Sequence, residues 1–189
     1  QTCALPISDC YETLGTKAQM NPPVREQRHQ DALWRAIAEG VVDVVGSDHA
    51  PHTLEEKAKA YPASPSGMPG VQTTLPLLLT AASRGKLSLE RVVDLLCHGP
   101  QRIYQIAGKG RIARGYDADF ALVDLQAWKT LEDKDMGSKV AWTPFAGRRV
   151  CGVPKITIVR GRTVMRDGEL LGSPIGQPVR FAETIPATS

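Results

Sequence analysis

The sequence predicts an α/β protein in which part of a parallel, helix-covered sheet is followed by a small β layer. The valine-rich run Val41–Val45 ends at Gly46 and polar side chains follow, as in a strand buried on both faces of a parallel sheet. Before this run, from about Glu26 to Glu39, apolar side chains recur near helical spacing. After Gly108 the pattern changes to alternating strands separated by glycine turns.

The composition is that of a globular domain and gives no sign of a nucleic-acid-binding, membrane-spanning or disulfide-rich protein. The chain has 189 residues with 42% apolar and 23% charged side chains, which is typical of a soluble globular domain or a piece of a larger one. A net charge of +3 with both signs interspersed gives no case for a nucleic-acid or membrane partner, and no run approaches the roughly 18 apolar residues of a membrane span. The cysteines lack C-x-x-C spacing and predict separate reduced thiols in a cytoplasmic protein: Cys3, Cys10, Cys97 and Cys151.

The first residues differ in character from the rest. Gln1–Ser8 shows no periodicity and resembles a translated sequencing adapter, so we expect a non-native leader there. On this interpretation the natural chain continues upstream of Asp9. The alternative is an ordinary disordered start.

The first predicted unit is a helix followed by a strand. Pro22 and Pro23 hold the preceding segment extended, and Gly40 is a plausible cap at the end of the helix. The strand Val41–Val45 then begins. The order of extended segment, helix, strand and polar turn indicates a β/α unit of a parallel sheet.

A long loop from His49 to Gly70 follows this strand. It is rich in proline and glycine, and loops of this length in a compact domain are either functional or disordered linkers. We expect one helical turn within Thr53–Ala60. Gly67 and Gly70 are available for positive φ or for close approach of the backbone to a ligand.

Helices and then strands complete the prediction. Val71–Ser83 is mostly apolar and should be buried, whereas Ser88 is expected to cap a helix over Leu89–Cys97 that ends at Gly99–Pro100. Gln101–Ala107 predicts one more short helix.

The last third of the chain is predicted to be a small β layer. Gly110–Asp124 is typical of a turn that leads into a strand. Lys155–Arg160 and Arg162–Arg166 alternate as in a β-hairpin, with a second turn at Asp167–Gly168. The intervening Trp128–Arg149 is interpreted as polar and irregular.

The candidate chemistry lies directly after the predicted strand. Asp48 offers carboxylate oxygens, and His49 and His52 offer imidazoles, at the strand end where α/β barrels carry their active sites. The pattern Asp-His-x-x-His is weak alone, but the strand and the long loop strengthen it. The structural alternatives are a helix-capping Asp48 and a solvated His52.

Three segments, Lys17–Arg25, Ser47–Lys57 and Pro65–Gln72, resemble the carboxyl-terminal half of bacterial type I dihydroorotases of the amidohydrolase superfamily. Gly108–Asp124 is similar to the superfamily's return into its small β domain. The Asp-His-Ala-Pro-His sequence is fairly specific for dihydroorotases, because related allantoinases and dihydropyrimidinases usually differ at the second histidine.

The resemblance implies the carboxyl-terminal part of a (β/α)8 TIM-like barrel over residues 9–107 and an incomplete small β-sandwich domain with its tail over residues 108–189. It also implies zinc-dependent, reversible hydrolysis of dihydroorotate to N-carbamoyl-L-aspartate in pyrimidine biosynthesis. Asp48 matches the aspartate that ligates zinc and shuttles the proton. His52 and Asn21 match substrate contacts, and Ser66 with Gly67 matches a backbone contact to the ring.

Much of the family's metal site has no counterpart in this sequence. The family uses one or two zinc ions, held by an early His-x-His pair and further ligands, whereas this chain has four histidines and no His-x-His. Because catalytic zinc takes three protein ligands or more, we expect these residues alone to bind zinc poorly and to be inactive.

The alternatives are another cyclic amidohydrolase, of allantoinase or hydantoinase type, and a non-catalytic dihydroorotase-like subunit that scaffolds aspartate transcarbamoylase. The full-length protein is expected to be a cytoplasmic homo-oligomer.

Overall fold

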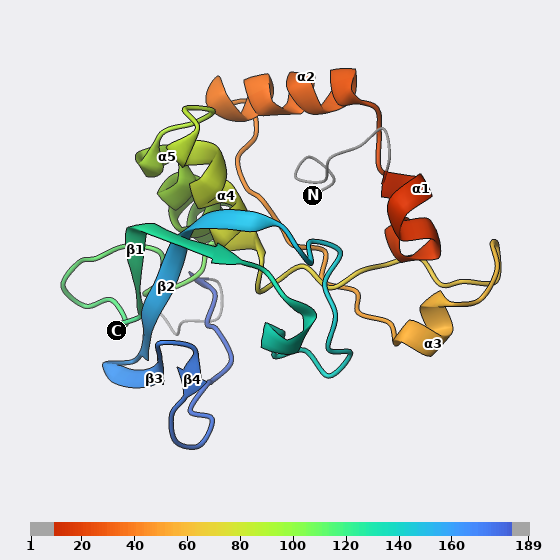
Figure 1. Cartoon of the computed structure of the whole chain (residues 1–189). Coiled ribbons are helices and arrows are strands. Elements are labelled where there is room, and N and C mark those ends of the chain that lie inside the picture. Colours follow the sequence, from red (N-terminus) through yellow and green to blue (C-terminus); the bar gives the residue numbers. More distant parts are fainter. Residues whose placement is uncertain (1–9, 183–189) are drawn as a thin grey trace.

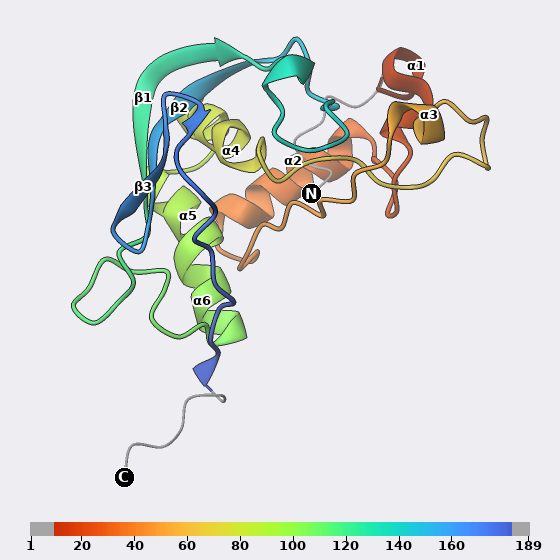
Figure 2. The same cartoon turned by 90° about the horizontal axis from the view of Figure 1, so that it is seen from below.

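The computed structural model describes residues 10–182, which form helices and a four-stranded antiparallel sheet against which the helix Thr74–Ser83 packs (Figures 1 and 2). The expectations for Gln1–Ser8 and for Cys3 lie outside the described residues. The helices are α1 (Cys10–Leu14), η2 (Gly15–Ala18), α2 (Gln27–Ala38), α3 (Leu54–Lys57), α4 (Thr74–Ser83), α5 (Leu89–Val93), η3 (Asp94–His98), α6 (Gly99–Tyr104) and η4 (Asp133–Asp135). The strands are β1 (Phe120–Thr130), β2 (Arg149–Val159), β3 (Arg162–Arg166) and β4 (Glu169–Leu170).

Helix α2 confirms the predicted amphipathic helix. Ile37 is buried and Trp34 is half-buried, and both pack with α4 and α5 in one core cluster. The helix ends at Ala38 with Glu39 as its C-cap, and Gly40 follows with φ of +82°, a left-handed conformation that glycine adopts without a steric penalty.

The predicted strand Val41–Val45 is wrong as secondary structure. The segment forms no ladder, because no other strand among residues 10–182 lies beside it. Helices hold its backbone instead: Val42 N–H bonds to Ala36 O at 3.3 Å, and Val45 N–H bonds to Leu95 O at 3.3 Å. The guanidinium of Arg91 also donates to the carbonyl of Val42. Val42 and Val45 therefore pack on helices in the described structure without being part of a sheet, whereas Val41 is exposed.

The helix that begins after Ser88 runs further than expected. Ser88 caps it as predicted, since its hydroxyl accepts the Arg91 N–H at 3.1 Å. The predicted end at Gly99–Pro100 is wrong: α5 passes through the π-helical turn η3 into α6, a nearly continuous rod in Figure 2. A Cβ on Gly99 would lie 2.2 Å from Asp43 O, so glycine here permits close packing and does not stop the helix. The wider π turn suits Pro100, which has no N–H to donate.

The β layer is a meander in the order β1-β2-β3-β4, and both predicted turns are confirmed. Arg160 and Gly161 have φ of +48° and +76°, and Asp167 and Gly168 have +49° and +91°. Positive φ at both central residues is the type I′ pattern whose twist matches a hairpin. Helix α4 packs on β2, where Gly152 leaves room for Leu79.

The prediction that Trp128–Arg149 is irregular holds between β1 and β2 but is wrong at both ends, because Trp128–Thr130 belong to β1 and Arg149 begins β2. The prediction that the segment is polar is also wrong. Trp142 is fully buried, and Phe145 is buried beside it. These side chains share a core with residues from the first third of the chain, so the β layer and the helical part are packed as one body. This core consists of Cys10, Ala18, Met20, Val24, Met68, Leu77, Leu131, Trp142, Phe145 and Val150.

Two further expectations can be compared with the described residues. The three cysteines among them, Cys10, Cys97 and Cys151, are free thiols, as predicted. Within residues 10–182 no helix has both the length and the apolar character needed to span a bilayer.

Candidate active site

Asp48 lies where the Val41–Val45 segment turns into the long loop. Its φ of +46° is left-handed, a conformation that aspartate tolerates better than most side chains. The side chain is exposed and forms no hydrogen bond or ion pair with the rest of residues 10–182. Both carboxylate oxygens are therefore available to a ligand.

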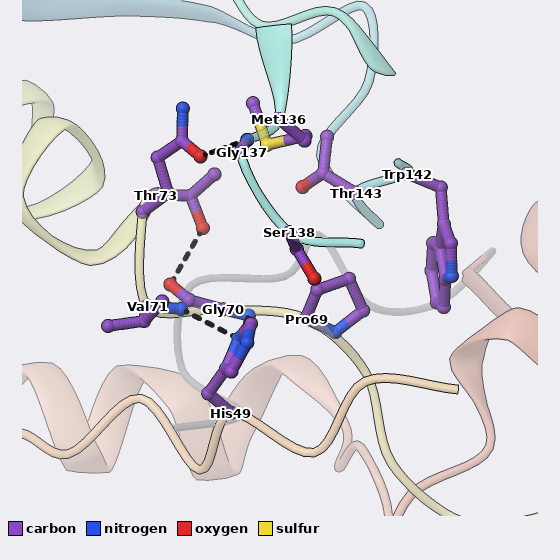
Figure 3. A pocket seen from close by; sticks show the side chains of 11 residues that line it. His49, Pro69, Gly70, Val71, Thr73, Met136, Gly137, Ser138, Trp142 and Thr143 are labelled. Carbon is purple, nitrogen blue, oxygen red and sulfur yellow. Dashed lines mark hydrogen bonds between the residues drawn. The ribbon is translucent and has the colours of Figure 1, made fainter. Parts of the chain in front are cut away.

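His49 connects this turn to the glycine-bearing loop. Its Nδ1 accepts the backbone N–H of Gly70 at 3.1 Å and that of Val71 at 3.4 Å (Figure 3). A nitrogen that accepts hydrogen bonds carries no proton, so the neutral ring holds its proton on Nε2. The backbone bond from Ala50 N–H to Met68 O, 3.2 Å, adds to the same connection. The sequence offered His49 as a candidate imidazole after the predicted strand, and in the structure its Nδ1 joins two loops.

The structure brings His52 together with Ser66 and Gly67. The contacts with substrate that the sequence predicts for these residues stay a prediction. The Nε2 of His52 lies 3.2 Å from Ser66 O, and its Nδ1 lies 3.7 Å from the carboxylate of Glu56. Gly67 has φ of +134°, and a Cβ there would lie 2.6 Å from Ala50 O. Only glycine fits this position without a shift of the backbone. The carbonyl of His52 accepts the indole N–H of buried Trp142 at 2.8 Å, and this bond fixes the backbone of His52.

Lys57 is the residue that sequence reasoning missed. Its side chain is 1% exposed, and its ammonium donates to Gln19 O at 2.9 Å, Pro65 O at 2.9 Å and Gly67 O at 3.0 Å. Burial lowers the pKa of Lys57. A lysine in a short charged helix is usually solvated, so the local pattern gave no signal of this burial.

Helix α3 holds this lysine in place. Thr53 and Glu56 form a capping box, with Thr53 N–H to Glu56 Oε2 at 2.8 Å and Glu56 N–H to Thr53 Oγ1 at 3.2 Å. The hydrogen bond from the Thr53 backbone lowers the pKa of Glu56. The Thr16 hydroxyl donates to the carbonyl of Lys57 and joins η2 to α3. We call residues 16–21, 52–57 and 64–68 the loop cluster.

Asn21 belongs to the loop cluster by its backbone neighbours. Gln19, two residues earlier, accepts the Gly67 N–H at 3.0 Å and donates from Nε2 to Ser64 O at 2.7 Å. Asn21 itself is exposed, and its side chain has no hydrogen-bond partner among the described residues. Its predicted contact with substrate stays a prediction.

A cavity of about 270 Å³ adjoins His49, and Trp142, whose indole N–H bonds to His52 O, also lines it. The 131–143 segment forms its opposite wall, as Figure 3 shows for Met136, Gly137 and Ser138. The side chain of Gln72 joins the two walls, because its Nε2 donates to Asp135 O and its Oε1 accepts from Gly137 N, both at 2.8 Å.

The donor set of the described residues does not fit a zinc ion. No three His, Cys, Asp or Glu side chains converge to hold a metal anywhere in residues 10–182. Asp48 is a single carboxylate, His49 uses Nδ1 on backbone amides, and His52 directs Nε2 at Ser66 O. Catalytic zinc takes three protein ligands or more, so Asp48 could supply only one of a larger set.

Comparison with known proteins identifies the family. Residues 6–164 match the model of the amidohydrolase family. The chain belongs to this family. The predicted fold class, part of a TIM-type barrel with a small β domain, is confirmed by this match and by the structural relatives.

Among its amidohydrolase relatives, the dihydroorotase of Halobacterium salinarum is 46% identical over 172 residues, which cover 91% of this chain and 40% of that protein. The dihydroorotase of Brevibacillus brevis is 37% identical over 160 residues, 84% of this chain and 37% of that protein. The solved L-hydantoinase (dihydropyrimidinase) from Arthrobacter aurescens aligns with a TM-score of 0.86 at 34% identity, covering 90% of this chain and 39% of that one. The chain thus spans about two fifths of the length of the relatives it matches, 40% and 37% for these two dihydroorotases.

Proposed function

We propose that this amidohydrolase is a dihydroorotase, which reversibly hydrolyses the cyclic amide of dihydroorotate to N-carbamoyl-L-aspartate in de novo pyrimidine biosynthesis. Dihydroorotase relatives at 36% to 46% identity support this proposal. The observation that carries it is that His52 lies against Ser66 and Gly67, beside the backbone of Gln19, in the long loop that follows Asp48. In this proposal the chain supplies the substrate-binding loops and one acidic group.

The loop cluster has the chemistry to bind a cyclic ureide that bears a carboxylate. His52 donates a hydrogen bond from Nε2, and a substrate carboxylate would compete with the Ser66 carbonyl, 3.2 Å away, for that proton. The exposed amide of Asn21 offers both a donor and an acceptor for ring amide groups, and the backbone at Ser66 and Gly67 offers more.

Asp48 is proposed to carry the proton. Its carboxylate would take a proton from the attacking water and return it to the ring nitrogen as the amide bond breaks. General acid–base catalysis of this kind contributes about 10²–10⁴-fold to the rate. Exposure and the absence of a partner within residues 10–182 leave Asp48 free for this work.

We also propose that the complete protein uses one or two zinc ions, with Asp48 as one ligand. The described residues cannot complete such a site, as the donor set shows. A homo-oligomeric state, a cytoplasmic location and an association with aspartate transcarbamoylase belong to the same proposal.

The test is an assay of the full-length protein, expressed from the complete coding sequence, beside the 189-residue chain. We expect the full-length protein to hydrolyse dihydroorotate and to lose activity with a chelator, and the chain alone to show no turnover. Chelator-sensitive hydrolysis by the chain alone would contradict the division of the site described above.

A hydantoinase-type activity is the second candidate, favoured by the L-hydantoinase alignment at a TM-score of 0.86. Values of kcat/KM on dihydroorotate, hydantoin and allantoin would separate the two. A non-catalytic subunit that scaffolds aspartate transcarbamoylase is the third. It predicts no turnover of any of these substrates and co-purification with the transcarbamoylase.

A further inference from the structure

We propose that Lys57 is a positioning residue whose buried ammonium fixes the loop cluster in the geometry that binds substrate. The proposal rests on the function proposed above and names a residue that sequence reasoning did not select. Lys57 touches no substrate on this account. It acts through the backbone of Gln19, Pro65 and Gly67.

The contacts of Lys57 form a complete set. An ammonium has three donors, and here each is within 3.0 Å of a carbonyl oxygen: Gln19 O, Pro65 O and Gly67 O. The side chain is 1% exposed, and no carboxylate pairs with it among residues 10–182. A buried charge is costly unless its hydrogen bonds are satisfied, so these three carbonyls are what make its burial possible.

The carbonyls that Lys57 holds enclose the predicted substrate contacts. Pro65 and Gly67 lie on either side of Ser66, whose own carbonyl faces His52 Nε2 at 3.2 Å. Gln19 O accepts both the Lys57 ammonium and the Gly67 N–H, at 2.9 and 3.0 Å. A shift in any one of these groups would therefore move Ser66 relative to His52.

The backbone of Lys57 is held as firmly as its side chain. The capping box of α3 fixes the helical turn, and the Lys57 carbonyl accepts from the hydroxyls of Thr16 and, at 3.4 Å, Ser64. A side chain without the ammonium would leave the carbonyls of Pro65 and Gly67 without a donor and Gln19 O with the Gly67 N–H alone. A buried carbonyl left without a donor is destabilising, which favours rearrangement of the loops over retention of their geometry.

The kinetic test uses the full-length protein with Lys57→Met and Lys57→Arg. Lys59→Met is the matched control, because Lys59 carries the same charge two residues later and is exposed. Lys57→Met should raise KM for dihydroorotate about tenfold or more, while kcat falls less. The displaced loops bind the substrate ring equally in the ground state and the transition state, so their loss weakens binding more than it slows the chemical step. Lys57→Arg should lie between Lys57→Met and wild type, and Lys59→Met should match wild type.

A merely structural role gives a different result: fewer folded molecules and a lower Tm, with KM unchanged in the enzyme that survives. That result would overturn the proposal. If Lys57→Met does not accumulate as folded protein, the KM and Tm of Lys57→Arg test the proposal instead. Arginine keeps the positive charge but cannot place three donors as the ammonium does, so KM should rise.

Hydrogen exchange supplies a readout that does not depend on activity. The Gly67 amide, bonded to Gln19 O, should exchange faster in Lys57→Met, whereas the Gly70 amide, bonded to His49, should not change. Unchanged exchange at Gly67 would overturn the proposal. If the wild-type protein hydrolyses no cyclic amide, the proposed function fails, and the exchange experiment still decides the role of Lys57.

Discussion

The loop cluster and the turn at Asp48 lie in one candidate site, but they are held in opposite ways. In the loop cluster, segments far apart in sequence are cross-linked by hydrogen bonds through Lys57 and Gln19. At the turn, Asp48 is exposed and has no partner within residues 10–182, and the Val41–Val45 segment before it forms no ladder.

The difference follows from what each region needs. A binding surface made of backbone groups can be assembled from a few loop segments by one buried cation and a few glycines. A metal site needs several side chains to converge, and in a barrel these come from different strands. Within the described residues, the substrate-binding loops are organised and the metal site is represented by a single carboxylate.

The largest effect is expected from Asp48→Asn in the full-length protein. The amide keeps the shape of the side chain but cannot accept and return a proton, so kcat should fall about 10²–10⁴-fold. Asp43→Asn is the control, since Asp43 is an exposed aspartate of the same segment. Steady-state assays on dihydroorotate measure both. An Asp48→Asn enzyme with near wild-type kcat would remove Asp48 from the mechanism.

Gly67→Ala should be next in size and would break the loop cluster directly. Its Cβ would collide with Ala50 O at 2.6 Å, and its φ of +134° disfavours any side chain. Strain and overpacking together should lower the free energy of unfolding by about 2–5 kcal/mol. Gly161→Ala has positive φ but open space around it, so it should cost about 1–2 kcal/mol. Denaturant unfolding compares them, and equal losses would show that Gly67 is not closely packed.

The smallest effect should lie far from both regions, at the ion pairs of the β layer. Burial raises the pKa of Asp119, but hydrogen bonds from the Lys109 ammonium and from Arg160 N–H, 2.8 Å, outweigh this and leave the pKa below its ordinary value. The stabilisation is thus present above about pH 3.9, the ordinary aspartate pKa, and is lost as the pH falls through the lower folded-state value.

Asp119→Asn should therefore reduce the free energy of unfolding by no more than about 1 kcal/mol at pH 7, with the difference from wild type vanishing in acid. Denaturant unfolding at a series of pH values measures this. A difference that grows as the pH falls would contradict the assignment.

Features with a local cause could be predicted from the sequence. The end of α2 follows from Gly40, and the hairpin turns follow from the Arg160–Gly161 and Asp167–Gly168 pairs, because each is decided by the φ preference of one or two residues. The amidohydrolase family was likewise recognisable from short motifs.

Features decided by distant neighbours could not be predicted. Valines at 41–45 fit a strand, but a ladder also requires a second strand beside them. Trp142 lies in a polar stretch, yet the core formed with Met20 and Leu77 buries it. The burial of Lys57 could not be predicted because its three carbonyl partners are 8 to 38 residues away in sequence.

The division between organised substrate loops and an incomplete metal site is tested most directly by calorimetric titration of the 189-residue chain with zinc chloride, beside its Asp48→Asn variant. We predict no tight stoichiometric binding to either, because Asp48 has no ligating partners among the described residues. Tight binding of zinc in equimolar amount, lost in the Asp48→Asn variant, would contradict the account.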